Sequence, residues 1–83
     1  MSTSPETRTS PEDALVTELS RWLAGHTSDE QLAARIERVG TERLDPGQAD
    51  AVEELLEELR AGRERAELEV PVREALEALA LGG

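Results

Sequence analysis

"DPGQADAVEELLEELRAG", residues 45–62, is the stretch that most clearly indicates a helical protein. Asp45 suits the N-cap of a helix, and Pro46 suits the first helical position, where no backbone N–H is needed. Gln48 follows Asp45 at the spacing of a capping box. One apolar stripe then recurs at helical intervals: Val52, Leu55, Leu56 and Leu59. The stretch predicts a helix from residue 46, which either ends at Gly62 or continues through it.

Similar signals predict a first helix near the start of the chain. Ser10 can cap it, Pro11 occupies its first position, and Gly25 offers a left-handed stop. The apolar stripe of this helix contains Leu15, Leu19, Trp22 and Leu23. Residues 1–9 have no apolar period, so we expect a disordered tail before a single helical domain at 10–83.

A second helix is predicted between these two. Ser28 and Gln31 have the capping-box spacing, and Gly40 can end the helix. Its buried side is predicted to contain Leu32, Ile36 and Val39.

Proline at position 71 disfavours helical angles at Val70, so we expect a break there. A short C-terminal helix at 71–80 would follow, with an apolar stripe of Val72, Ala75, Leu76 and Leu79. The predicted fold class is therefore all-α, a small bundle of three main helices plus a short C-terminal helix.

The composition limits which functions are reasonable. The net charge is −10, and all nine basic residues are arginine. Phosphate backbones and anionic membranes would repel such a chain, so we expect neither nucleic acid nor a membrane as partner. The chain has no cysteine, and its opening residues do not have the pattern of a signal peptide, so a cytoplasmic location is expected. The abundance of Ala, Arg, Glu and Leu is typical of a GC-rich bacterial genome.

The quoted stretch contains two adjacent pairs of glutamates: Glu53, Glu54, Glu57 and Glu58. They could form a solvated face, a docking surface for a basic partner, or a metal site. Metal centres in helical bundles use Glu-x-x-His motifs on several helices, and this chain has one histidine. Residues 45–59 hold six acids and no base, and like charges along a helix repel, which suggests that the acidity is used.

Apolar residues supply further candidates for partner binding. Trp22 is the only aromatic residue; it is either a core anchor or a partly exposed contact residue. With so small a core, we expect the stripe at 71–80 to leave Leu76 and Leu79 exposed to a partner or a second copy. His26, in the turn after Gly25, is interpreted as a surface residue. Whether Ser4 or Ser10, each followed by proline, is phosphorylated stays open.

The sequence contains no nucleophile with a base, no phosphate-binding glycine loop and no metal-ligand spacing. It predicts no catalytic residue, no cofactor and no metal. The expected function is that of a non-enzymatic acidic interaction protein (an adaptor, inhibitor or accessory subunit) that binds a partner with a basic surface. The alternative is a structural protein that self-associates as a homodimer.

The chain contains three short pieces in a fixed order. They are "LAG" at 23–25, "QADA" at 48–51, and "RAEL" at 65–68 with a following "VP". The set resembles pieces of the small helical subunit of adenosylcobalamin-dependent diol dehydratases. This resemblance implies a further alternative, namely a small helical subunit of a larger enzyme complex.

Overall fold

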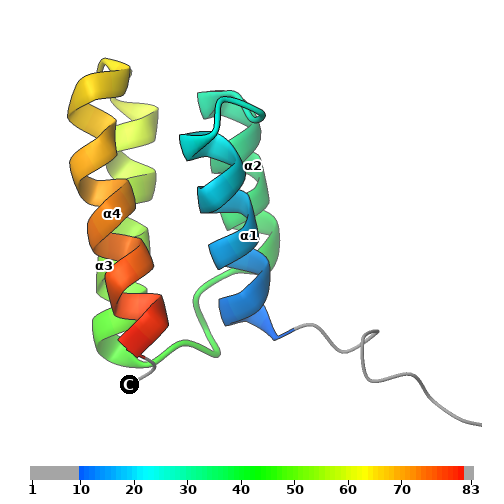
Figure 1. Cartoon of the computed structure of the whole chain (residues 1–83). Coiled ribbons are helices and arrows are strands. Elements are labelled where there is room, and N and C mark those ends of the chain that lie inside the picture. The colour runs from blue at the N-terminus through cyan, green and yellow to red at the C-terminus, as the bar shows by residue number, and fades with distance from the viewer. Residues whose placement is uncertain (1–9, 82–83) are drawn as a thin grey trace, which may run out of the picture.

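The computed structural model describes residues 10–81, which form four helices and contain no strand. The helices are α1 (Pro11–Leu23), α2 (Asp29–Val39), α3 (Pro46–Arg60) and α4 (Arg65–Leu81). They run alternately up and down (Figure 1). The prediction of an all-α bundle is confirmed. The predicted tail at 1–9 and the question of Ser4 lie outside the described residues.

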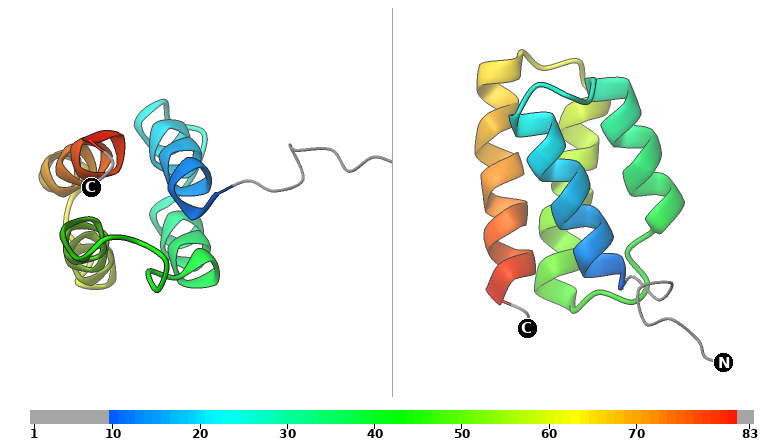
Figure 2. Two further views of the ribbon diagram at one scale, coloured as in Figure 1. Left: turned by 90° about the horizontal axis from the view of Figure 1, so that it is seen from below. Right: turned by 45° about the vertical axis from the view of Figure 1, so that its right-hand side comes forward.

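The bundle consists of two helical hairpins packed side by side. We call residues 10–44, with α1 and α2, the first hairpin, and residues 45–81, with α3 and α4, the second hairpin. Seen along its axis, the bundle has four corners, with α1 diagonal to α3 (Figure 2). Contacts join α1 to α2, α3 to α4, α1 to α4 and α2 to α3. Each helix therefore buries one side and exposes the opposite one.

The predicted helix starts are confirmed by hydrogen bonds. The Ser10 hydroxyl accepts the backbone N–H of Asp13 at 3.1 Å. Ser28 and Gln31 form the reciprocal capping box, with bonds of 3.1 and 3.2 Å. These bonds satisfy backbone donors that the first turn of a helix otherwise leaves without partners.

The end of α3 answers the question that the sequence left open. The helix stops at Arg60, and Gly62 has a φ of 75°, in the left-handed region where a Cβ is strained. The chain therefore turns at 61–64 and starts a new helix at Arg65.

The fourth helix corrects the sequence-based prediction of a break. α4 has 17 residues, is the longest of the described helices and passes through Pro71. A proline inside a helix costs about 3 kcal/mol. Core residues on both sides of Pro71 offset this cost, because each buried Leu or Val contributes about 1.5–3 kcal/mol. These residues are Leu68, Val72, Ala75 and Leu79. The predicted break at Pro71 and the short last helix are therefore wrong.

The core is aliphatic around a single aromatic ring. Trp22 is fully buried and belongs to one core cluster with side chains from all four helices and with Leu44. The aliphatic members are Leu15, Leu19, Leu32, Ile36, Leu44, Val52, Leu55, Leu59, Leu68, Val72, Ala75 and Leu79. Of the two interpretations of Trp22, the core anchor is the one that its burial supports.

Candidate functional site

Polar groups enclose Trp22 from two sides at the end of the bundle where both hairpins turn. Its indole Nε1–H donates to the Asp29 carboxylate at 2.6 Å. The guanidinium of Arg65 lies over the ring, 4.0 Å from its centroid. A buried indole N–H needs an acceptor, and a cation over the ring face adds electrostatic attraction. These contacts join α1, α2 and α4 to one another, so we interpret their role as stabilising the fold.

Arg65 also completes the end of α1. It donates to the backbone carbonyl oxygens of Trp22 and Leu23, the second at 3.4 Å. Carbonyls in the last turn of a helix lack intrahelical donors. The Trp22 carbonyl also accepts the Gly25 backbone N–H at 3.0 Å, and Arg65 adds a second donor there. This role of Arg65 was not predicted from the sequence. The available signal was an arginine in the first turn of a helix, where the dipole disfavours a positive charge.

A second polar link lies at the opposite end of the bundle. Gln48 is only 2% exposed, and its Nε2 donates to the backbone carbonyl oxygen of Ala78 at 3.2 Å. Its Oε1 accepts the backbone N–H of Asp45 at 3.1 Å, which is the predicted capping bond. One side chain thus caps the start of α3 and binds the end of α4. The capping spacing was visible in the sequence, whereas the link to α4 was not.

The four predicted glutamates lie along the outer side of α3. The Glu53 carboxylate accepts a 3.0 Å hydrogen bond from the Thr41 hydroxyl. Glu58 forms a 2.8 Å ion pair with Arg63. Glu54 and Glu57 are exposed and make no hydrogen bond or ion pair with another described side chain.

The nearest base in sequence does not neutralise this row. Arg60 follows Glu57 by three residues, a spacing at which helical side chains can pair. Its guanidinium instead pairs with Glu37 of α2. The acidic side of α3 is therefore left largely uncompensated within residues 10–81.

The apolar residues that the structure exposes differ from those predicted from the sequence. Leu79 is only 4% exposed and Leu76 is half-buried against the core, so the stripe at 71–80 is not open as predicted. Two other residues of α4 are the exposed large hydrophobics of the described chain: Val70 at 59% and Leu81 at 85%. The stripe is covered because α4 continues through Pro71 and packs its full length against α1 and α3.

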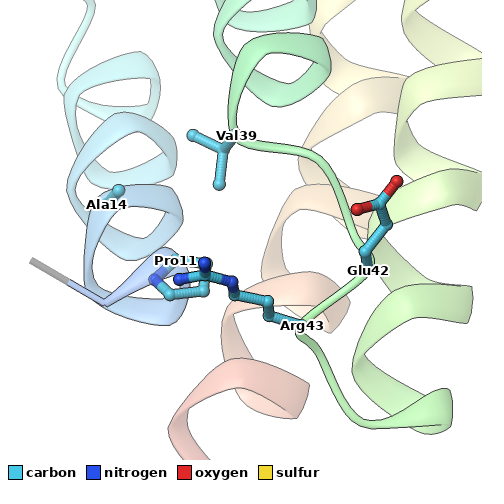
Figure 3. A pocket seen from close by; sticks show the side chains of 5 residues that line it. All are labelled: Pro11, Ala14, Val39, Glu42 and Arg43. Atoms are coloured by element: carbon cyan, nitrogen blue, oxygen red, sulfur yellow. The ribbon is translucent and has the colours of Figure 1, made fainter.

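A hollow lies between the start of α1 and the segment that connects α2 to α3. It has a volume of about 390 Å³ and is lined by Pro11, Ala14, Val39, Glu42 and Arg43. Arg43 extends toward Pro11, whereas Glu42 points away from it (Figure 3). In a ligand pocket or an active site, several polar groups point toward one place, and the side chains that line this hollow do not.

Metal binding finds no support in residues 10–81. No group of three or more His, Asp or Glu side chains in this range could hold a metal ion. His26 is exposed, and its backbone N–H donates to the Arg21 carbonyl oxygen at 2.8 Å, within the turn after α1. This position agrees with the interpretation of His26 as a surface residue.

Charge is distributed unequally between the hairpins. The first hairpin has seven acids and four arginines, and the second has eleven acids and four arginines. Most of the net charge therefore lies on the second hairpin. Of its arginines, Arg60, Arg63 and Arg65 are engaged in the contacts described above.

Comparison of the chain with protein-family models, with curated proteins and with solved structures finds no match. Among the helices of residues 10–81, none is both long and apolar enough to cross a bilayer.

Proposed function

We propose that the chain is a non-enzymatic interaction protein that binds a protein partner with a basic surface through its second hairpin. The observation that supports this most is the outer side of α3, where Glu54 and Glu57 are exposed without a described counter-charge. Adaptor, inhibitor and accessory subunit are the roles that such a surface serves.

Electrostatic attraction is the reason why this surface suits a basic partner. Like-signed carboxylates close together raise the local potential, and a potential of this kind accelerates encounter with an opposite charge. The same carboxylates slightly destabilise their own helix through mutual repulsion. A basic partner would relieve that repulsion.

The alternatives have less support. Self-association would bring two surfaces of the same sign together, in a protein with a net charge of −10. A role as a subunit of an enzyme complex rests only on the resemblance of short sequence pieces, and no described pocket adds to it.

The test compares two variants that remove the same amount of charge from different hairpins. The second-hairpin variant carries Glu53→Gln, Glu54→Gln, Glu57→Gln and Glu58→Gln. The control variant carries Glu12→Gln, Glu18→Gln, Glu30→Gln and Glu42→Gln, all in the first hairpin and free of described ion pairs. The probe is a synthetic, fluorescent, arginine-rich helical peptide, and stopped-flow fluorescence gives its association rate.

We expect the second-hairpin variant to associate more slowly than wild type, with little change in the dissociation rate, because rim charges act mainly on encounter. The wild-type rate should fall as salt rises, since the Debye length shrinks from about 10 Å at 0.1 M to about 3 Å at 1 M. The control variant should stay close to wild type. Equal rates and equal salt dependence for all three proteins would show that the glutamates are only a solvated face.

A further inference from the structure

The outer surface of α4 combines exposed apolar and acidic side chains in a regular order. Val70, Glu74, Glu77 and Leu81 follow one another at intervals of four, three and four residues. Such residues lie on one side of a helix, above one another. We call these four residues the α4 stripe. All four are exposed, because the core of α4 lies on the opposite side.

The stripe has a defined length. Val70 and Leu81 are eleven residues apart, which is about 16 Å at a rise of 1.5 Å per residue and about three helical turns. Glu74 and Glu77 fill the two positions between them. The order is thus apolar, acidic, acidic, apolar, and it reads the same in both directions along the helix.

Neighbouring groups extend the acidic character of the stripe. α3 and α4 are antiparallel, and Gln48 contacts Ala78 and Leu79, so Glu54, which has no described counter-charge, lies level with the part of α4 that follows Val70. Pro71 has no backbone N–H, which leaves the carbonyl oxygen of Glu67 without its helical donor. An incoming cationic side chain would find acceptors around Val70.

A shallow recess lies next to Leu81 on this surface. It has a volume of about 260 Å³ and is lined by Asp45, Gly47, Gln48, Ala78 and Leu81. Gly47 leaves open space there, since a Cβ added to it would meet no atom within 4 Å. An apolar side chain of a partner could pack between Gly47 and Leu81.

A second copy of the chain fits this surface poorly. Two antiparallel copies aligned through Val70 and Leu81 would place Glu74 opposite the other copy's Glu77, and parallel copies would place identical glutamates together. Like charges brought face to face are repelled in either orientation. Arginine or lysine at the two central positions of a partner would instead complement both glutamates.

We propose that the α4 stripe docks a basic amphipathic helix of a partner protein, with two apolar side chains eleven residues apart and arginine or lysine at the two intervening positions of that side. This inference rests on the proposed function and specifies the partner for the second hairpin. Charge brings the partner to the hairpin, and the spacing of the apolar side chains selects which basic helix stays bound.

The experiment uses two synthetic helical peptides of identical composition. The matched peptide carries two leucines spaced like Val70 and Leu81, with arginines at the two intervening positions of the same side. In the shifted peptide, one leucine is moved by half a turn, to the other side of the helix. Both are titrated against wild type, Val70→Ser/Leu81→Ser and Ala80→Ser, which is an exposed control on α4 outside the stripe.

We expect the matched peptide to bind wild type about tenfold more tightly than the shifted peptide, because it alone buries both leucines against the stripe. Val70→Ser/Leu81→Ser should lose this preference, keep its salt dependence and keep its helical spectrum, since neither residue contributes to the core. Ala80→Ser should behave as wild type.

The possible negative results distinguish a failure of the docking inference from a failure of the proposed function. Equal affinity for both peptides, unchanged by Val70→Ser/Leu81→Ser, would overturn the docking inference and leave the proposed function standing. The absence of binding of either peptide at low salt would overturn both. Light scattering that shows a wild-type dimer, and a monomer for Val70→Ser/Leu81→Ser, would identify a second copy as the occupant and overturn the inference.

Discussion

The two hairpins of this bundle differ in their charge and in how well their residues suit a helix. The first holds Trp22 and Asp29 and has seven acids and four arginines. The second has no aromatic residue, contains Pro71 within a helix and has eleven acids and four arginines. Local features that disfavour a helix are therefore concentrated in the second hairpin. The inner side of the second hairpin packs against the first hairpin. Its outer side can therefore hold residues, such as adjacent glutamates, that do not stabilise the helices.

The largest change in stability is expected when Trp22, the core anchor in the first hairpin, is replaced. Trp22→Ala should lower the free energy of unfolding by about 3–5 kcal/mol, as large-to-small core substitutions do. A domain of this size has few kcal/mol in total, so the variant should be largely unfolded at 25 °C. Urea titration followed by circular dichroism measures the change. A loss below about 1 kcal/mol would contradict the assignment of Trp22 as the core anchor.

The second hairpin should respond in the opposite direction when its proline is replaced. Pro71→Ala restores a helical N–H and should raise the free energy of unfolding, by up to about 3 kcal/mol. Pro46→Ala is the matched control, because Pro46 occupies the first position of α3, where proline fits without cost. That control should change stability little. If Pro71→Ala destabilised the protein, a continuous α4 would be in doubt.

A smaller effect tests the polar contact of Trp22. Asp29→Ala leaves the buried indole N–H without an acceptor and should cost about 1–3 kcal/mol. Asp29→Asn keeps an oxygen acceptor and should cost less. Glu30→Ala removes an exposed acid from the same helical turn, where the dipole contribution is about 0.3–1 kcal/mol. Equal losses for Asp29→Ala and Glu30→Ala would show that the bond to Trp22 adds nothing.

Much of the fold could be predicted because its signals are local. The caps at Ser10 and Ser28, the proline at the start of α3 and the apolar stripes each involve residues within a turn or two of one another. Such features follow from helix geometry alone. The stop at Gly62 was predicted only as one of two outcomes, and the left-handed backbone of this glycine shows that the helix ends there.

The parts that could not be predicted depend on contacts between distant residues. Pro71 disfavours a helix locally, and only the burial of Leu68 and Val72 on either side of it explains why α4 continues. Arg65 reaches Trp22 across 43 positions, and Gln48 reaches Ala78 across 30. The exposure of Val70 and Leu81 in place of Leu79 follows from the same continuation of α4. Sequence periodicity placed the acidic row on the outside of α3, but it could not show that Arg60 pairs with α2.

Mapping the peptide contact by NMR tests most directly the claim that the second hairpin is the binding half. The matched peptide is titrated into isotope-labelled protein, and the chemical-shift changes of the backbone amides are followed. We predict that the changes concentrate on the outer sides of α3 and α4, at residues 50–58 and 70–81, and leave α1 and α2 nearly unchanged. Changes centred on the first hairpin, or spread evenly over both, would contradict the account.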